Sequence, residues 1–122
     1  MEILVVDDEK HMASLFQDYL EIIGSHKVTV AHSGSEALEK IKMKKPDLII
    51  LDQYMPGLTG VEVVGELKNV EDTKDIPVVI FSVADRPSHK VRKSLGILGY
   101  FSKPIDFKKL KQIIAEVQKE KN

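Results

Sequence analysis

The stretch DLIILDQYMPG at residues 47–57 is the strongest indication of how this chain folds. Its four consecutive apolar residues, with no polar residue between them, are typical of a strand that is covered on both faces. The run EILVV at 2–6 has the same character, and aspartate stands at the end of both strands. A strand that only had to stop could end in a neutral turn residue. The stretch therefore predicts a buried sheet that places carboxylates at one edge.

Strand-like and helix-like patterns alternate along the whole chain. Short apolar runs predict strands, and apolar residues at three- and four-residue spacing predict helices. Five strands alternating with five helices need crossover connections, so we expect a mainly parallel sheet with helices on both faces. In such sheets, ligands bind outside the carboxyl ends of the strands. The predicted strands are 2–6, 27–31, 47–52, 76–82 and 99–102, and the predicted helices are 11–24, 33–45, 59–69, one that opens near Pro87, and a last one capped by Asp106.

Single residues mark several of these helix ends and faces. Ser33 and Glu36 have the spacing of a capping box, and Gly24 suits the end of the first helix. Met43 and Met55 are interpreted as packing residues. No two histidines have metal-ligand spacing, so all four are expected at the surface. The third helix is expected to bury Val61, Val64 and Leu67, and the surface histidines are His11, His26, His32 and His89.

Composition limits the class of protein. A length of 122 residues fits a single domain spanning 1–122. Because 18 basic residues nearly balance 19 acidic ones, charge gives no reason to expect nucleic acid or a membrane surface as partner. The chain has no cysteine, which excludes disulfides and thiolate metal sites. It shows neither a secretory signal nor an apolar run of the roughly 20 residues that span a membrane, so a cytoplasmic domain is expected.

Three aspartates follow the two central apolar strands. Any one of Asp7, Asp8 and Asp52 is explained equally well by helix capping or by solvation of a loop. If the two strands are adjacent, however, all three side chains converge. At about 4 Å and an effective dielectric near 20, each like-charged pair costs on the order of 4 kcal/mol. Such a cluster must hold a proton or a cation, and oxygen ligands without histidine or cysteine favour Mg²⁺.

Two further polar residues end strands at the same predicted edge. Ser82 ends the fourth strand and Lys103 follows the fifth. Each by itself is an ordinary solvated strand end. Together with the aspartates, they supply a hydroxyl donor and a fixed cation, which are the groups needed around the oxygens of a phosphoryl group. The pattern therefore indicates phosphoryl chemistry with an aspartate nucleophile.

Four motifs together resemble the receiver domain of two-component response regulators. They are VVDDE (5–9), LDQYMPGLTG (51–60), the strand-ending Ser82 and YFSKP (100–104), and their order and spacing agree with the family over essentially the whole chain. The resemblance implies a flavodoxin-like doubly wound fold, with a five-stranded parallel sheet in the order 2-1-3-4-5 and five helices.

The resemblance also implies a role for each site residue. Asp52 is expected to accept a phosphoryl group from the phosphohistidine of a sensor histidine kinase or a phosphotransfer protein. Asp8 and Asp52 would ligate Mg²⁺, Asp7 would hold a metal-bound water, and the backbone carbonyl of Tyr54 would be a further ligand. Lys103 would pair with the phosphoryl oxygens. Its bond to Pro104 is expected to be cis.

A switch and a contact surface are implied in the same way. Ser82 would move toward the phosphoryl group, and Tyr100 would turn inward when it does. The surface that responds would comprise the last two helices and the fifth strand, roughly 89–117, and would contact an output protein or a C-terminal output domain absent from this chain. Its basic residues, which solubility explains equally well, are Lys90, Arg92, Lys93, Lys108, Lys109 and Lys111.

Three positions depart from what the family usually has around the acceptor. Val83 is branched where a small residue is common, Tyr54 is bulky, and Ala84 carries no group that could orient an attacking water. We therefore predict slow self-dephosphorylation, with a phosphoryl lifetime that shortens in Tyr54→Ala. The measurement is the decay of the phosphorylated mass with time. An unchanged lifetime in Tyr54→Ala, or a shorter one with a larger side chain at this position, contradicts the prediction.

Two other functions compete with this one. A magnesium-dependent phosphohydrolase with an aspartyl nucleophile shares the chemistry, but such enzymes typically carry a second aspartate two residues after the nucleophile, where this chain has Tyr54. A degenerate receiver that signals without phosphate is the other. The complete set of Asp7, Asp8, Asp52, Ser82 and Lys103 argues against it, whereas Val83 favours it.

Overall fold

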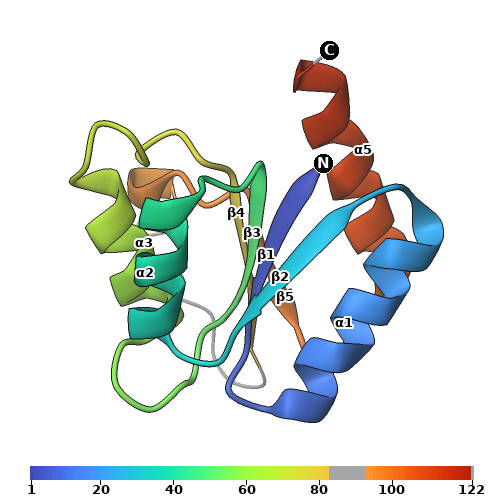
Figure 1. Cartoon of the computed structure of the whole chain (residues 1–122), viewed down its shortest axis with the longest axis horizontal. Helices are drawn as coiled ribbons and strands as arrows, with labels where there is room; N and C mark the ends of the chain where they lie inside the picture. Colours follow the sequence, from blue (N-terminus) through green and yellow to red (C-terminus); the bar gives the residue numbers. More distant parts are fainter. Residues whose placement is uncertain (83–92, 122) are drawn as a thin grey trace.

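One parallel sheet of five strands forms the centre of the computed structural model, which describes residues 1–82 and 93–121 (Figure 1). The strands lie in the order β2-β1-β3-β4-β5, so the predicted fold class and strand order are confirmed. All carboxyl ends therefore meet at one edge of the sheet. The strands are β1 (Glu2–Val6), β2 (Lys27–Ala31), β3 (Leu48–Asp52), β4 (Val78–Ser82) and β5 (Gly99–Ser102).

Helices cover both faces of the sheet. Helices α2 and α3 lie on one face, and α1 and α5 lie on the other (Figure 1). The predicted helix near Pro87 falls mainly on 83–92, outside the described residues, and 93–95 are helical. Within 1–82 and 93–121, no helix combines the length and apolarity needed to cross a membrane. The helix bounds are α1 (Lys10–Ile23), α2 (Gly34–Met43), α3 (Gly60–Lys68) and α5 (Phe107–Lys121).

The strand side chains divide between two apolar clusters because successive residues of a strand point to opposite faces. In β3, Ile49 and Leu51 pack on the α2 and α3 side, whereas Leu48 and Ile50 pack on the α1 and α5 side. Every residue of β3 and β4 is buried. This two-sided burial explains why both strands are continuous apolar runs rather than alternating ones. It also means that Asp52, at the end of β3, emerges from the middle of the core.

Helix ends follow the sequence signals in part. Gly24 ends α1 as predicted but in an extended conformation, and a Cβ there would lie 2.8 Å from His26 Nε2, so the His26 ring would have to shift to admit a side chain. Ser33 caps α2, but the Glu36 carboxylate accepts from the backbone N–H of His32, so the predicted capping box is only half formed. A complete box forms at α3 from Thr59 and Glu62.

Several burial predictions were wrong. Val61 is only half-buried, and its neighbour Val63 takes the buried position beside Val64 and Leu67. Met43, predicted to pack, is 87% exposed, whereas Met55 is buried as predicted.

One predicted surface histidine lies inside the protein. His26 is buried, and its Nδ1 lies 3.2 Å from the amino group of Met1. Burial and then the charge of that amino group lower the pKa of His26. His11 is exposed as predicted, and His89 lies outside the described residues.

Candidate functional site

Three carboxylates converge at the carboxyl edge of the sheet. Asp7 and Asp8 follow β1, Asp52 ends the adjacent β3, and one oxygen of each lies within 4.8 Å of the others. Asp7 and Asp52 are buried, whereas Asp8 is exposed. We call these three residues the acidic cluster. Its geometry gives a small cation several oxygen ligands on the protein side and leaves the Asp8 side open to water.

Lys103 supplies the positive charge that faces the acidic cluster. Its Nζ lies 3.5 Å from an oxygen of Asp7 and 3.5 Å from an oxygen of Asp52, and its side chain is only 12% exposed. The backbone N–H of Lys103 donates to the carbonyl of Ser82 at 2.8 Å, which fixes the start of this loop to the end of β4. The Lys103–Pro104 peptide bond is cis, as expected. The single positive charge of Lys103 therefore lies beside two buried carboxylates and neutralises their negative charge only in part.

The environment of Asp52 favours its protonated form. Burial, and then the charge of Asp7, raise the pKa of Asp52 to about 6. Lys103 and the backbone N–H of Tyr54, which donates to the carboxylate, oppose this rise. The folded protein thus binds a proton at Asp52 more tightly than the unfolded chain does. The ionised form at neutral pH stores unfavourable free energy that a bound cation would relieve.

We predict that Asp52 makes the metal-free protein less stable as pH rises. Because its pKa rises from 3.8 to about 6 on folding, the native state holds more protons between these values, and the free energy of unfolding falls with increasing pH. The loss from this group is up to about 3 kcal/mol between about pH 4 and pH 7. The measurement is urea unfolding in EDTA across this range.

Other groups titrate in the same range, so the comparison is made with Asp52→Asn. The free energy of unfolding of the variant minus that of the wild type should grow as pH rises. A difference that stays constant with pH would show that Asp52 does not titrate in this way.

The backbone after Asp52 is fixed to the start of α3. The N–H of Gly60 donates to the carbonyl of Gln53 at 2.9 Å, and the N–H of Val61 donates to the Gln53 side-chain carbonyl at 2.9 Å. The N–H of Gln53 in turn donates to the carbonyl of Phe81 in β4. Gln53 and Gly60 therefore position Asp52. Sequence reasoning missed both, although the cap residue Thr59 directly before Gly60 marked this helix start.

Gly60 leaves no room for a side chain. A Cβ there would lie 2.8 Å from the backbone oxygen of Asp52 and 3.0 Å from the Cα of Gln53. We expect Gly60→Ala to lower the free energy of unfolding by about 2 kcal/mol, because backbone atoms must shift. Gly65→Ala in the same helix is the matched control, since a Cβ there meets nothing within 4 Å. It should stabilise by about 0.5–1 kcal/mol. Equal effects of the two substitutions, measured by urea unfolding, would contradict this account.

Asp7 is held by the end of β2 and by its own loop. Its N–H donates to the carbonyl of Ala31 at 3.0 Å, and its carbonyl lies 3.1 Å from Nδ1 of His32. Its carboxylate accepts from the N–H of Glu9 at 2.9 Å. His32, expected at the surface, is half-buried and thus links the start of α2 to the acidic cluster. The signal that could have found it is its place between β2 and the cap residue Ser33.

The remaining predicted site residues occupy different environments. Ser82 is fully buried at the end of β4, and Tyr100 is buried in the cluster on the α2 and α3 side. The Tyr54 side chain is 49% exposed. Val83 and Ala84 lie outside the described residues, as do Lys90 and Arg92. The basic residues of the predicted contact surface that can be placed are all exposed, namely Lys93, Lys108, Lys109 and Lys111.

Comparison with known proteins gives a consistent result. The family described as "Response regulator receiver domain" matches residues 3–115. The response regulator MprA of Mycobacterium avium (strain 104) is 35% identical over 90% of this chain and 47% of its own length. Protein PilH of Pseudomonas aeruginosa is 34% identical over 94% of this chain and 95% of its own length.

Solved structures agree with these relatives. The response regulator protein TrrA from Thermotoga maritima, in complex with Mg²⁺-BeF, has a TM-score of 0.83 and 32% identity, covering 95% of this chain and 97% of its own. The chain spans about half the length of several curated relatives that it matches, MprA among them.

Proposed function

The chain belongs to the family of response regulator receiver domains, and we propose that it is a phosphorylation-controlled switch in which Asp52 accepts the phosphoryl group. The observation that carries the proposal is the placement of Asp52. It is a buried carboxylate at the end of the central strand β3, 3.5 Å from Lys103 Nζ and grouped with Asp7 and Asp8. The whole chain, 1–122, would act as one receiver domain in a two-component system.

The proposed reaction is a phosphoryl transfer from the phosphohistidine of a sensor histidine kinase or a phosphotransfer protein. An oxygen of the ionised Asp52 attacks phosphorus, and an acyl phosphate bond forms. The bond from phosphorus to the histidine nitrogen breaks, and its electron pair leaves with the imidazole, which takes up a proton from water. Lys103 supports the transfer because its ammonium group already lies beside the attacking carboxylate and can pair with phosphoryl oxygens.

A magnesium site fits the acidic cluster. Asp7, Asp8, Asp52 and the Tyr54 carbonyl would hold Mg²⁺, which needs a few oxygen ligands and retains several waters. When bound, Mg²⁺ would neutralise the negative charge that the phosphoryl group brings. The excess of carboxylates over Lys103 and the raised pKa of Asp52 both support a cation there. The related TrrA was solved in complex with Mg²⁺-BeF, which supports magnesium as the cation.

The readout would pass through β4 and β5. Phosphorylation adds about −1.5 to −2 charge and three acceptor oxygens, to which the hydroxyl of Ser82 can donate. Ser82 is linked to the next strand because its carbonyl accepts from Lys103 N–H. Tyr100 lies in β5, buried in the core cluster, so a shift of β4 would reach it. The predicted contact surface, roughly 89–117 with β5 and α5, would then contact an output protein or a C-terminal output domain.

The experiment that tests this function is the intact mass of the protein after incubation with acetyl phosphate. We expect one added phosphoryl group in the presence of Mg²⁺ and none in EDTA. No added mass under any condition would favour a receiver that signals without phosphate. Continuous hydrolysis of a small phosphate ester such as p-nitrophenyl phosphate would instead favour the phosphohydrolase.

A further inference from the structure

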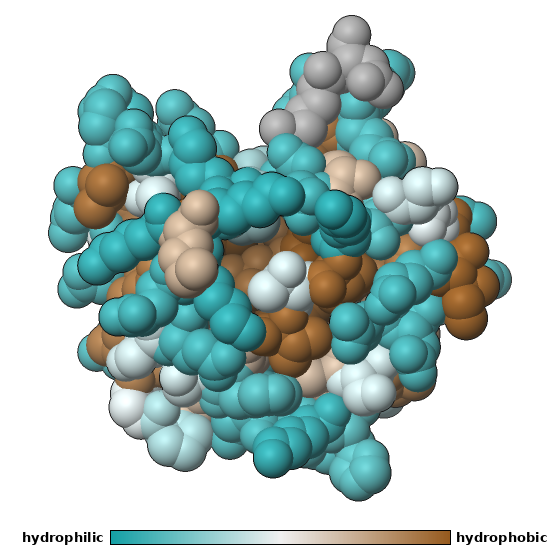
Figure 2. All heavy atoms as spheres, in the orientation of Figure 1, coloured by the Kyte–Doolittle hydropathy of each residue, from teal (hydrophilic) through white to brown (hydrophobic). Residues whose placement is uncertain are grey.

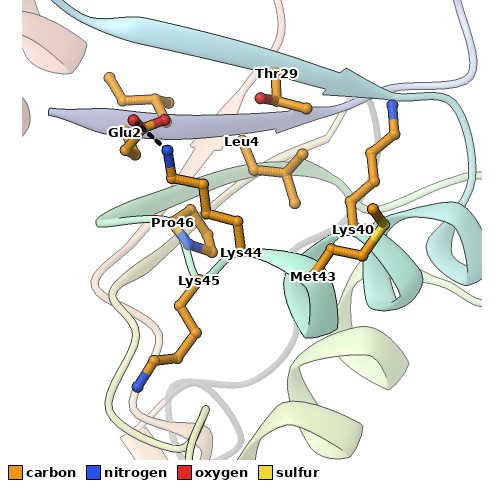
Figure 3. Close-up of a pocket in the computed structure, with 9 residues that line it drawn as sticks. Glu2, Leu4, Thr29, Lys40, Met43, Lys44, Lys45 and Pro46 are labelled. Carbon is orange, nitrogen blue, oxygen red and sulfur yellow. Dashed lines mark hydrogen bonds and ion pairs between the residues drawn. The ribbon is translucent and has the colours of Figure 1, made fainter.

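A second candidate site lies at the end of β1 that is remote from the acidic cluster. A pocket of about 280 Å³ opens there between the β1 and β2 strands and the C-terminal end of α2 (Figure 3). Leu4 and Thr29 line it from the sheet, and Met43 and Pro46 line it from the helix side. Figure 2 shows this face as a hollow with hydrophobic residues at its floor and hydrophilic residues around it. We call it the β1–β2 pocket.

The pocket exists because α2 does not cover the amino-terminal part of the edge strand β2. In β2, Val28 and Val30 pack against the α1 and α5 side, whereas Lys27 and Thr29 on the opposite face are exposed. Helix α2 ends at Met43, whose side chain is 87% exposed beside the pocket. Methionine is flexible and polarizable, so it adapts to the shape of an inserted apolar group. An apolar floor with a movable wall is suited to receiving one apolar side chain.

The charged residues at the rim are spread around the pocket. The amino groups of Lys40 and Lys44 lie on opposite sides of Leu4, and Lys45 extends outward on the side of Pro46 (Figure 3). Lys44 pairs with the one acidic lining residue, Glu2, at 3.0 Å. The Lys44 side chain is 67% exposed, so the pair is weak, and an incoming carboxylate can compete with Glu2 for Lys44. Lys45 is exposed and makes no ion pair with any residue that the structure describes.

Lys40 also decides how a partner can approach. Its amino group donates to the carbonyl of Val30, in addition to pairing with Glu36 at 3.0 Å. The next carbonyl, that of Ala31, accepts from Asp7 on the β1 side, so the carbonyl of Val30 points to the free edge of β2. Lys40 thus occupies an acceptor that an added strand would need. Side-chain insertion, rather than strand addition, is the mode of binding that this edge allows.

We propose that the β1–β2 pocket binds an acidic peptide segment of a protein partner, which inserts one apolar side chain over Leu4 and pairs its flanking carboxylates with Lys44 and Lys45. The amino groups of Lys44 and Lys45 point in different directions (Figure 3), which favours a peptide with two flanking carboxylates over a single small carboxylate. This contact surface is separate from the acidic cluster. It is also separate from the β5 and α5 surface proposed for the output partner.

The test uses the full chain, labelled with ¹⁵N and with ¹³C-methyl groups, and capped five-residue peptides followed by NMR titration. The probe peptide has a central phenylalanine flanked on each side by two acidic residues. We expect saturable shifts of the Leu4, Thr29 and Met43 signals. Peptides with a central alanine or with lysine flanks, and free phenylacetate, should bind at least about fivefold more weakly, the factor that corresponds to about 1 kcal/mol.

Variants separate the pocket from general charge attraction. Thr29→Phe should fill the pocket and abolish the shifts of Leu4 and Met43, whereas Thr29→Val keeps the pocket open and should bind normally. Lys45→Glu should weaken binding about fivefold, whereas Lys119→Glu on exposed α5 is the matched control and should have little effect. The dispersion of the amide signals confirms that each variant is folded.

Three outcomes would overturn the proposal. The first is the absence of shifts at the pocket residues. The second is that the alanine peptide binds as tightly as the phenylalanine peptide, or that Thr29→Phe binds the phenylalanine peptide as tightly as the wild type does. Either result would make the contact purely electrostatic. The third is equal or tighter binding of phenylacetate, which would make the pocket a small-molecule site. Because none of these readouts requires phosphorylation, they are independent of the proposed role of Asp52.

Discussion

Asp52→Asn is expected to abolish phosphorylation by acetyl phosphate and Mg²⁺ while the protein stays folded. Asparagine keeps the size of the side chain but removes the nucleophilic carboxylate at the end of β3. The fold should tolerate the change because burial and Asp7 already disfavour the charged form of Asp52. The measurement is the intact mass after a fixed incubation, with circular dichroism to verify folding. The expected loss is complete.

The matched control for this prediction is Asp18→Asn. Asp18 lies exposed on α1, outside the acidic cluster, so the same chemical change there should leave phosphorylation intact. Asp8→Asn should lower phosphorylation while Asp52 remains available, because it removes a proposed magnesium ligand. A phosphoryl mass that persists in Asp52→Asn would mean that another residue is the acceptor, and peptide mapping would identify it.

Lys103→Met is expected to destabilise the metal-free protein by about 2 kcal/mol near pH 8. The substitution removes the ammonium group that lies 3.5 Å from both Asp7 and Asp52 and leaves two buried carboxylates facing each other. The effect is smaller than that of breaking a fully enclosed ion pair because the cluster is open to solvent on the exposed Asp8 side, and solvent weakens the repulsion between the two carboxylates. Methionine keeps much of the apolar stem, so the change reports mainly on charge.

The pH dependence distinguishes charge from packing in this variant. Near pH 5 Asp52 takes up a proton, so one of the two like charges of Asp7 and Asp52 disappears. The destabilisation caused by Lys103→Met should therefore shrink. Lys109→Met is the control, because Lys109 lies exposed on α5 and its loss should change stability by less than about 0.5 kcal/mol. Both are measured by urea unfolding in EDTA. A loss of stability that is the same near pH 5 and pH 8 would assign the role of Lys103 to packing.

The positions of the two proposed sites follow from the same architecture. Parallel strands bring the ends of β1, β3, β4 and β5 to one edge, where Asp7, Asp52, Ser82 and Lys103 stand. The β1–β2 pocket lies at the opposite end of β1, where the short helix α2 leaves the amino-terminal part of the edge strand β2 uncovered.

Local sequence patterns were sufficient to predict the architecture and the chemical character of the main site. The continuous apolar runs of β1, β3 and β4 require cover on both faces, and the helical periods between them supply it. These are local signals that repeat along the chain. The strand order came from the family resemblance instead, and the structure confirms it. The aspartates were found because their position at strand ends is visible without knowledge of any contact.

The distances, the burial and the supporting contacts depend on how the elements pack together. Lys103 lies 96 residues from Asp7 in the chain, and no local pattern could give their separation of 3.5 Å. The raised pKa of Asp52 depends on desolvation, which is a property of the packed core. The close approach of Gly60 to the carbonyl of Asp52 and the bond from His32 to Asp7 join segments that are adjacent only in the fold. Patterns in a sequence report which face of an element is buried, whereas these features depend on which elements meet and how closely.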